Sequence, residues 1–244
     1  MMDKRRANKL RSKLRRPEFM GAFDDLVEFT GLPWQRVCEL IAASSAGVGR
    51  EFVRVSPRDS VEVDLFYRCC REYLFLNSYR SVWPLMVTNK KLIKSPVLDF
   101  GAGCGNDTLW LAEKGYDVDY YEFSMIQREF MEFRLARREC DTVDVVKPYD
   151  GGKYDPLGCV DRGYRYGAVM FRDILEHTAR YAEILERVVP FLAADGVMLE
   201  HSPWHRGSES SSDRVLHVEE STPLSKVMDD LGMKSISVGV WRRK

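Results

Sequence analysis

The sequence predicts an α/β fold in which helices flank a doubly wound, mostly parallel sheet of six or seven strands. From about residue 96 onward, short apolar runs alternate with apolar residues at helical spacing, and glycines follow the first run. Strands that alternate with helices of this length imply right-handed crossovers and a parallel sheet. Residues 17–95 show helical spacing alone. We therefore expect a basic arm over 1–16, a helical cap or lid over 17–95 and the sheet domain over 96–244.

Composition limits the class of protein. A chain of 244 residues is long enough for one large domain, or for one domain with a cap. Its 37 basic and 37 acidic residues cancel, so the whole-chain charge favours neither a nucleic acid nor an anionic membrane as partner. The sequence has no membrane-spanning apolar run, no signal peptide and no C-x-x-C pair among its six cysteines. We expect a soluble, cytoplasmic protein with buried, reduced thiols.

The first 16 residues carry most of the charge asymmetry, because they hold eight basic side chains against one acid, Asp3. A terminus of this kind is commonly solvated and partly disordered, which is the interpretation that we favour. Its charge also fits contact with a nucleic acid or another acidic surface, and this alternative stays open. A mitochondrial presequence is a third option, although the segment has an early acid and a single serine.

Helical patterns cover the segment before the sheet domain. One helix is expected to start at Pro17 and stop at Gly31, and a second to start at Pro33. Residues 46–60 are polar and contain Gly, Ser and Pro, so we expect a loop there. A third stripe of apolar residues at helical spacing follows, made of Leu65, Phe66, Cys69, Cys70, Tyr73 and Leu74.

The sheet domain divides into expected strands and helices. Strands are expected at 96–100, 116–122, 143–146, 168–171, 197–201 and 236–241. Helices are expected at 106–113, 124–140, 181–189 and 222–231. Ser124 and Gln127 have the spacing of a capping box, which predicts the start of the second of these helices. Residues 147–165 and 202–220 are expected to be loops.

A glycine-rich turn follows the first expected strand. Asp99 precedes Gly101, Gly103 and Gly105, and a helix follows directly. Glycines allow a tight turn and a close approach of the backbone to a ligand, and ligands of such sheets bind at the carboxyl ends of the strands. Glu122 ends the second strand, where a carboxylate can accept hydrogen bonds from both ribose hydroxyls. The pattern predicts a nucleoside-containing cofactor.

Two details distinguish this turn from a dinucleotide site. The G-x-G-x-x-G spacing would put the third glycine at position 106, which is Asn106, and the third glycine comes one residue earlier. Asp99 would repel a pyrophosphate, but it suits a cofactor that carries an ammonium group and a sulfonium. Both details indicate S-adenosylmethionine (SAM) as the cofactor and S-adenosylhomocysteine (SAH) as its product.

Four segments of the chain resemble the class I SAM-dependent methyltransferase family. They are the glycine-rich turn after Val97-Leu98-Asp99-Phe100, the acid Glu122, the segment Asp173-Ile174-Leu175-Glu176-His177 and the turn from Leu192 through Gly196 to Leu199. Their order and spacing are similar to those of the family, in which the third segment reads D-x-L-E-H. The resemblance covers about residues 96–244 and leaves the first 95 residues unexplained.

The resemblance implies a set of cofactor-binding residues. They are Asp99, Phe100, Gly101, Ala102, Gly103, Gly105, Asn106, Glu122, Phe123 and Arg172. By this resemblance the turn cradles the methionyl part of SAM, Asp99 lies near its amino group, and Glu122 binds the ribose. Phe123 packs beside the adenine or in the core, and Arg172 lines the site or lies at the surface. The third strand has no clear acid for the adenine amine, for which Asp150 is a poor substitute.

The end of the chain departs from the family, which usually ends in an antiparallel pair of strands. Only about 12 residues follow Gly232, so we expect the second of these strands to be missing or supplied by another segment.

The expected activity is transfer of a methyl group to O, N or C of a small molecule by in-line displacement, a reaction that depends largely on positioning and water exclusion. One alternative is an RNA methyltransferase that uses the basic arm. Another is a non-catalytic scaffold that binds SAM. The intact glycines and Glu122 argue against a decayed site, but they indicate cofactor binding alone.

Candidates for catalysis and for acceptor binding are few. A hydroxyl or ammonium acceptor requires a base, and His177 and His201 follow strands at the ligand-bearing edge, although a structural role is favoured for His177. Four aromatic residues before the turn are candidates for a lid over the acceptor, although burial against the sheet is the favoured role for most of them: Tyr73, Phe75, Tyr79 and Trp83. Tyr79 and Trp83 are one turn apart on an expected helix face, and these two and His205 are candidates for contact with the acceptor. Side chains of types that bind metals occur at Glu200, His201, His205 and His217, but no metal is expected, because Pro203 breaks any helix that would put His201 and His205 on one face.

Overall fold

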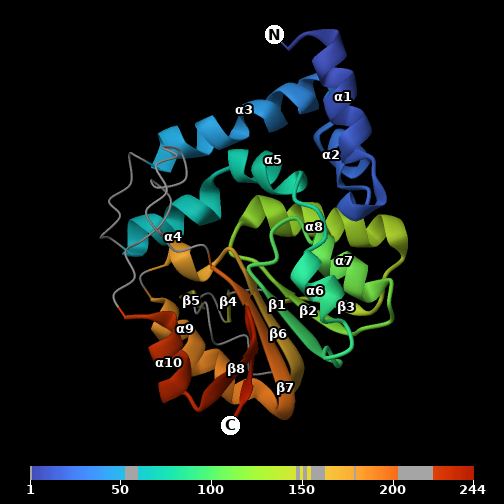
Figure 1. The fold of residues 1–244 in the computed structure, drawn as a ribbon. Coiled ribbons are helices and arrows are strands. Elements are labelled where there is room, and N and C mark those ends of the chain that lie inside the picture. Colours follow the sequence, from blue (N-terminus) through green and yellow to red (C-terminus); the bar gives the residue numbers. More distant parts are fainter. Residues whose placement is uncertain are drawn as a thin grey trace.

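The structure is a computed structural model in which a central sheet lies between two helical layers and the N-terminal helices lie above one of them (Figure 1). It describes residues 2–52, 60–146, 149–150, 153–154, 163–178, 180–202 and 222–244. The helices are α1 (Lys4–Leu14), α2 (Ala22–Thr30), α3 (Trp34–Phe52), α4 (Ser60–Cys69), α5 (Glu72–Ser78), α6 (Pro84–Thr88), α7 (Asn106–Ala112), α8 (Met125–Arg138), α9 (Tyr181–Val188) and α10 (Leu224–Asp230). The strands are β1 (Val97–Phe100), β2 (Val118–Tyr121), β3 (Val143–Val146), β4 (Tyr149–Asp150), β5 (Lys153–Tyr154), β6 (Tyr166–Arg172), β7 (Leu192–His201), β8 (Met233–Ser237) and β9 (Val240–Arg243).

The main sheet has seven strands in the order β3-β2-β1-β6-β7-β9-β8. The first five of these are parallel, and β9 runs antiparallel to both β7 and β8. The predicted doubly wound, mostly parallel sheet is therefore confirmed. The chain moves outward from β1 through β2 to β3 and then returns to β6 on the other side of β1. This switch point is where such sheets bind ligands.

Alternation along the strands divides the core between the two faces of the sheet. Leu98 and Phe100 pack with apolar residues of α9 and α10, whereas Val97 packs with residues of α6, α7 and α8. Successive side chains of a strand point to opposite faces, so a strand buried on both sides is apolar throughout. The register places Phe100 beside Tyr121 and Phe171, which brings the carboxyl ends of β1, β2 and β6 to one level.

The end of the chain differs from the expectation that one strand was missing. Residues 233–243 form both β8 and β9, joined by a two-residue turn at Val238 and Gly239. Gly239 adopts a φ of +68°, which a glycine reaches without strain, so 11 residues suffice for the hairpin. The expectation was wrong because it allowed for a longer connection.

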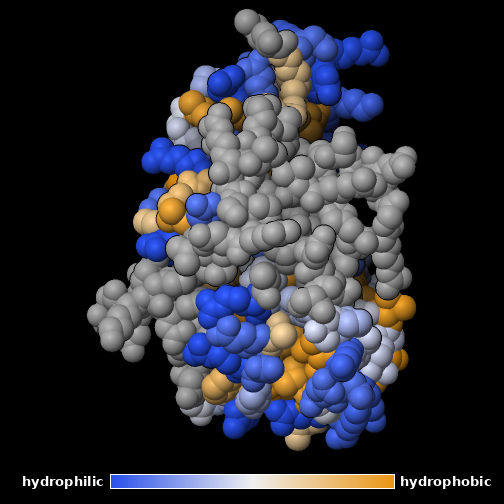
Figure 2. Space-filling model, turned by 90° about the vertical axis from the view of Figure 1, so that its left-hand side faces the viewer, coloured by the Kyte–Doolittle hydropathy of each residue, from blue (hydrophilic) through white to orange (hydrophobic). Residues whose placement is uncertain are grey.

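Two predictions for the N-terminal region were also wrong. The basic arm is not disordered in the described structure: residues 4–14 form α1, Asp3 caps it, and Ala7 and Leu14 are buried against α2 and α3. Its basic residues face outward at the top of the molecule, where Figure 2 shows mainly hydrophilic side chains. Helix α3 continues to Phe52, so the first part of the expected loop at 46–60 is helical.

Tyr79 and Trp83 do not share a helix face. Helix α5 ends at Ser78 and α6 begins at Pro84, so both residues lie in the connection. Tyr79 is exposed, and Trp83 is buried in the core beneath α6. Among the five cysteines in the described part of the chain, Cys69 is exposed, contrary to the expectation of buried thiols. No helix in the described ranges is long and apolar enough to cross a membrane.

Candidate functional site

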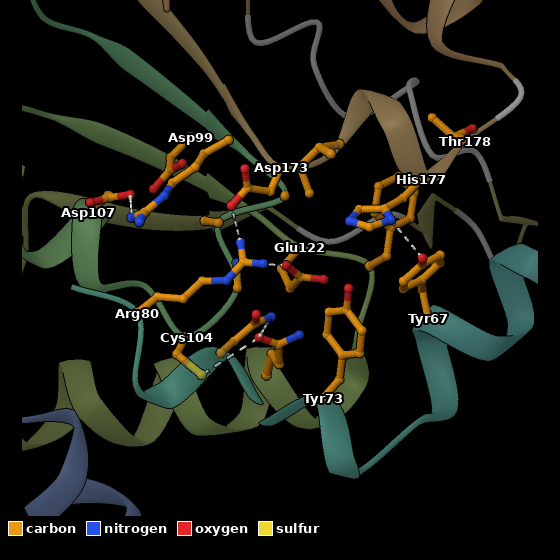
Figure 3. A pocket seen from close by; sticks show the side chains of 18 of the residues that line it. Tyr67, Tyr73, Arg80, Asp99, Cys104, Asp107, Glu122, Asp173, His177 and Thr178 are labelled. Carbon is orange, nitrogen blue, oxygen red and sulfur yellow. Dashed lines mark hydrogen bonds and ion pairs between the residues drawn. The ribbon is translucent and has the colours of Figure 1, made fainter. Parts of the chain in front are cut away.

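A pocket opens at the carboxyl ends of β1, β2 and β6, between the sheet and helices α4 and α5 (Figure 3). It is lined by Tyr67, Tyr73, Asn77, Arg80, Asp99, Gly101, Ala102, Gly103, Cys104, Asn106, Asp107, Glu122, Phe123, Gln127, Arg172, Asp173, Ile174, His177, Thr178, Arg180 and Ile184. In Figure 3, Asp99 and Asp107 lie at one end and Tyr67 and His177 at the other, with Glu122 between them. The pocket therefore joins the predicted cofactor turn to the N-terminal helices.

The glycines of the turn are required by space and by backbone conformation. Gly101 has a φ of +72°, and a Cβ atom there would lie 2.2 Å from Cδ1 of Ile174. Gly103 has a φ of +57°, and side chains of Asn77 and Gln127 close over it at 3.2 and 3.3 Å from the place of a Cβ. The hydroxyl of Tyr120 donates to the carbonyl of Gly103 at 2.6 Å. These contacts fix the conformation of the turn, which is open on the side that lines the pocket.

Glu122 is buried at the end of β2, and its carboxylate is fixed by backbone donors. The amide of Gly103 donates to Oε2 at 2.7 Å, and the amide of Ser124 donates to Oε1 at 2.8 Å. Burial raises the pKa of Glu122, and these backbone hydrogen bonds oppose the rise. Glu122 accepts from the amide of Ser124, a role that a capping box would give to the side chain of Gln127, and the hydroxyl of Ser124 makes no capping hydrogen bond. Gln127 instead accepts from Asn77 at 2.9 Å, so the predicted capping box is wrong.

Two further acids, Asp99 and Asp107, lie side by side at the other end of the pocket. Thr108 donates to Asp99 at 2.6 Å, while Asp107 accepts from the amide of Trp83 at 2.7 Å and from Arg172 at 2.9 Å. Burial, together with the neighbouring charge of Asp107, raises the pKa of Asp99 to about 7. Asp99 therefore titrates near neutral pH and can respond to a cation placed in the pocket.

The N-terminal helices supply the side of the pocket that faces the sheet. Tyr67 of α4 and Tyr73 and Asn77 of α5 line it, as does Arg80 from the segment after α5. Burial raises the pKa of Tyr67 and that of Tyr73 well above the usual value for a tyrosine, so both hydroxyls stay protonated at neutral pH. Among these four residues the sequence singled out Tyr73, as part of an apolar helix stripe and as a candidate for the lid over the acceptor, whereas Tyr67, Asn77 and Arg80 carried no signal of a site.

The two candidate bases differ in their surroundings. Nδ1 of His177 lies 3.0 Å from the hydroxyl of Tyr67 and the ring lines the pocket. His201 lies outside the lining, is 56% exposed at its side chain, and makes a 2.6 Å contact with Asp173. Its hydrogen bond to Asp173 raises the pKa of His201, which favours the protonated form. Asp173 also pairs with Arg80 at 2.8 Å, and its φ of +53° is rare for a residue with a side chain.

Glu176 is the neighbour of His177 and is fully buried. Its two carboxyl oxygens have no hydrogen-bond partner among the described residues, and one of them lies 3.8 Å from Nε2 of His177. Burial raises the pKa of Glu176 to about 8. A carboxyl group with so few donors is neutral over most of the physiological range.

The structure brings most of the predicted site residues together. The pocket lining includes Asp99, Gly101, Ala102, Gly103, Asn106, Glu122, Phe123, Arg172 and His177. It does not include Phe100, Gly105, Tyr79, Trp83 or His201. Phe100 lies in the core, and Gly105 faces Met131, whose Sδ would lie 2.3 Å from a Cβ there. His205 and the side chain of Asp150 lie outside the described residues. Within those residues, no group of three His, Cys, Asp or Glu side chains is placed to hold a metal ion.

Fold and pocket together define an α/β protein with a glycine-rich ligand site at the switch point of its sheet. A family model described as "Methyltransferase domain" matches residues 63–221, which is more than half of the chain. The chain belongs to this methyltransferase domain family. The predicted resemblance is confirmed, and so is the predicted cofactor, because methyltransferase domains of this fold use SAM. The match begins within α4 and includes α5 but not the first three helices.

Solved structures of methyltransferases are similar to parts of the chain. The CcbJ methyltransferase from Streptomyces caelestis is 22% identical with a TM-score of 0.39, over 47% of this chain and 45% of that one. The glycopeptide N-methyltransferase MtfA in complex with SAM is 21% identical with a TM-score of 0.38, over 47% and 50%. Coclaurine N-methyltransferase is 17% identical with a TM-score of 0.39, over 80% and 62%. The chain thus spans about half the length of the first two. No curated protein matches it.

Proposed function

We propose that this protein transfers a methyl group from SAM to a small-molecule acceptor. The observation that carries the proposal is the arrangement of two buried acids, Asp99 and Glu122, around the open turn at Gly101–Gly103. A carboxylate at Glu122 suits the two ribose hydroxyls, and a carboxylate at Asp99 suits an ammonium group. SAM carries both of these groups, the hydroxyls on its ribose and the ammonium on its methionyl part.

The residues present fit this cofactor in a further respect. Oδ1 of Asn77 has no hydrogen-bond partner among the described residues, although Asn77 is buried and lines the pocket. A buried polar atom without a partner is costly, so an acceptor in the lining of a pocket is expected to meet a donor on the ligand. Phe123 offers an apolar surface for the adenine. Arg80 and Arg172 supply cations for the methionyl carboxylate, since both line the pocket.

When bound, SAM supplies an electrophilic methyl carbon, whose bond to sulfur breaks as the bond to the acceptor atom forms in line with it. The protein residues hold the reactants in position and exclude water, which are the main contributions available to such a displacement. The pocket continues from the cofactor turn to α4 and α5, which leaves a place for the acceptor beside the cofactor. Tyr67 and Tyr73 line the side of the pocket that faces the sheet, and we place the acceptor between these two side chains and the cofactor turn.

The same geometry selects between the two candidate bases. His201 pairs with Asp173 and is held toward its protonated form, in which it cannot accept a proton. His177 faces Tyr67 at the acceptor end of the pocket. If the acceptor is a hydroxyl or an ammonium group, we assign removal of its proton to His177. An acceptor that is already deprotonated, such as a thiolate, would not need this step.

Turnover tests the proposal. The purified protein is incubated with SAM carrying a labelled methyl group and with fractions of a small-molecule extract, and both SAH and labelled product are measured. The expected result is SAH that depends on at least one fraction, and none with Gly103→Arg, which fills the turn. Binding of SAM without any SAH from any fraction would contradict an enzymatic role and favour a scaffold.

A second candidate acceptor is RNA, which the basic surface of α1 favours. Lys4, Arg5, Arg6 and Lys9 are all exposed on this helix. Proteins that contact phosphates through such residues bind RNA with an affinity that falls steeply with salt. The test compares RNA affinity across salt concentrations for the wild type and for a variant in which Arg5, Arg6 and Lys9 are changed to Glu. Equal, weak binding by both proteins would remove this candidate.

A further inference from the structure

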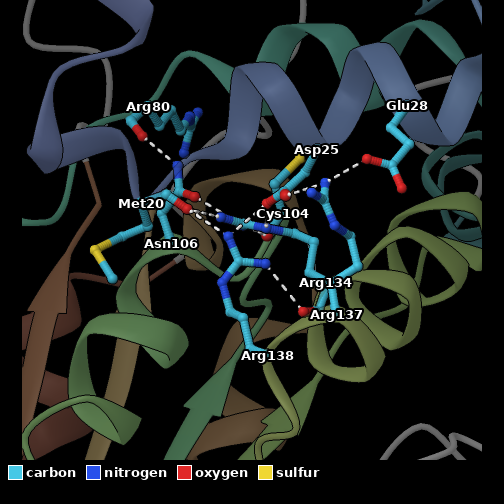
Figure 4. A network of polar contacts seen from close by, with 9 residues as sticks. All are labelled: Met20, Asp25, Glu28, Arg80, Cys104, Asn106, Arg134, Arg137 and Arg138. Atoms are coloured by element: carbon cyan, nitrogen blue, oxygen red, sulfur yellow. Dashed lines mark hydrogen bonds and ion pairs between the residues drawn. The ribbon is translucent and has the colours of Figure 1, made fainter.

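A buried arginine of α8, Arg134, contacts the cofactor turn but does not line the pocket (Figure 4). The side chain of Arg134 is fully buried, and burial lowers its pKa to about 10. Burying a guanidinium is unfavourable unless its donors are satisfied and its charge is balanced. A residue of this kind is therefore expected to be fixed by specific partners.

The partners of Arg134 come from two distant parts of the chain. On one side, Nε donates to Asp25 of α2 at 2.9 Å and one terminal nitrogen donates to the carbonyl of Met20 at 2.7 Å. On the other side, the second terminal nitrogen donates to Oδ1 of Asn106 at 2.8 Å and to the carbonyl of Cys104. One planar group thus joins α2 to the cofactor turn.

The turn side of this network leads directly into the pocket. Cys104 and Asn106 both line it. Nδ2 of Asn106 donates to the carbonyl of Arg80 at 2.6 Å, and the side chain of Arg80 pairs with Asp173 at 2.8 Å. Arg134 therefore orients Asn106 so that its amide reaches the segment carrying Arg80. A shift of the guanidinium would move the turn and this segment together.

A neighbour shows that the contact with the turn is a particular property of Arg134. Arg138, one helical turn later, also binds Asp25, at 2.7 Å, and the carbonyl of Met20, at 3.0 Å. Its other hydrogen bond in the described structure goes to the carbonyl of Arg134 at 2.9 Å. Arg137 contacts Asp25 and Glu28. These two arginines fix α2 against α8, whereas Arg134 also holds the cofactor turn.

We propose that Arg134 is a positioning residue for the cofactor, through which α2, outside the family match, sets the affinity of the turn for SAM and SAH. The inference rests on the proposed function. If the turn must be ordered to bind, an anchor that orders it beforehand lowers the cost of binding. The coupling is reciprocal, so bound cofactor should in turn stabilise the contact of α2 with α8.

The first test compares Arg134→Lys with the matched control Arg138→Lys in the full chain. The probe is SAH, titrated by calorimetry, and thermal unfolding reports stability for each protein. A lysine keeps the charge near Asp25 but cannot reach both sides of the network. Both variants are expected to unfold at lower temperature than the wild type. Arg134→Lys alone should bind SAH more weakly, by about tenfold, the usual effect of losing charge-assisted hydrogen bonds.

The outcomes are distinguishable. Equal affinities for SAH in the wild type and Arg134→Lys, or equal weakening in both variants, would overturn the inference and leave the proposed function standing. No binding of SAH by the wild type would instead contradict the proposed function.

The second test uses the wild type alone, so it does not depend on the folding of a variant. Amide hydrogen exchange is measured with and without saturating SAH. Slower exchange in α2, at residues 22–30, is expected, together with little change in α10, which lies on the opposite face of the sheet. An unchanged rate in α2 would contradict the coupling, since a purely structural role predicts no response to the ligand.

Discussion

The two sides of the pocket are built in different ways. The sheet side, made of Asp99, Gly101–Gly103 and Glu122, consists of acids and glycines that backbone amides and short hydrogen bonds hold in place. The helix side, made of Tyr67, Tyr73, Asn77 and Arg80, consists of larger side chains on the N-terminal helices. A site for an invariant cofactor requires fixed polar groups, whereas a site for an acceptor is defined by shape. We therefore assign the cofactor chiefly to the sheet side, with Asn77 and Arg80 as additional contacts from the helix side, and the acceptor to Tyr67 and Tyr73.

The largest effect is expected from filling the turn on the sheet side. Gly101→Val adds a Cβ that would lie 2.2 Å from Ile174, at a φ of +72° that a β-branched residue does not adopt. SAH affinity measured by calorimetry should fall at least about 100-fold. Gly115→Val is the control, because Gly115 has a φ of +81° but no described atom within 4 Å of its added Cβ. A similar loss of affinity in both variants would show that backbone strain alone matters.

The second prediction tests whether water reaches the buried carboxyl group of Glu176, which lies where the two sides of the pocket meet. The groups that influence Glu176 are the side chains of Asp173, Arg80, Glu200, Tyr67, Tyr73 and His177. Burial raises the pKa of Glu176 from 4.5 to about 8, so the wild type loses stability as pH rises through this range. Glu176→Gln removes the titration.

Unfolding by denaturant at pH 6 and pH 9 measures the effect. Relative to the wild type, Glu176→Gln should gain about 2 kcal/mol of stability between these two pH values. A difference that does not change with pH would show that the carboxyl group is solvated or paired.

The third prediction concerns the charge of Asp99 on the sheet side. Because its pKa is raised to about 7, Asp99 is largely protonated at pH 6, and a bound ammonium group favours its ionised form. SAH affinity should therefore rise about tenfold from pH 6 to pH 8. The control ligand is 5′-methylthioadenosine, which lacks the ammonium group and should show little of this dependence. An equal dependence for both ligands would assign the titration to another group.

The smallest effect is expected on the helix side. Tyr67→Phe removes a hydroxyl that contacts His177 but leaves the ring in place. We expect SAH affinity to change by less than about threefold, and stability to fall by about 1 kcal/mol, the usual cost of one hydrogen bond. Calorimetry and thermal unfolding measure the two quantities. A large loss of SAH affinity would place the cofactor against the helix side and remove the distinction between the two sides.

The sheet side could be predicted from the sequence because its determinants are local. The spacing from Asp99 to Gly105 and the distance to Glu122 depend on strand and turn geometry alone. The strand predicted at 143–146 coincides with β3, and the strand predicted at 197–201 coincides with the second half of β7. The prediction failed where local signals compete. Ser124 and Gln127 have capping-box spacing, but the amide of Ser124 donates to Glu122 and the side chain of Gln127 accepts from Asn77.

The helix side could not be predicted because its residues meet the sheet through contacts distant in sequence. Asn77 reaches Gln127 across 50 residues, and Arg134 reaches Asp25 across 109. An asparagine or arginine on an expected helix is usually solvated, so neither residue type signals a buried contact by itself. The failure at Tyr79 and Trp83 has a related cause, since the helix expected to carry both ends at Ser78.

The central claim is that the sheet side binds SAM, and a calorimetric titration of the wild type tests it most directly. We predict saturable binding of one SAM per chain, weakened at least about tenfold in Glu122→Gln, because the ribose hydroxyls lose a charged acceptor. Thermal unfolding of the two proteins without ligand serves as the control for folding. A wild-type protein that is folded but gives no binding of SAM, or binding that Glu122→Gln leaves unchanged, would contradict the claim.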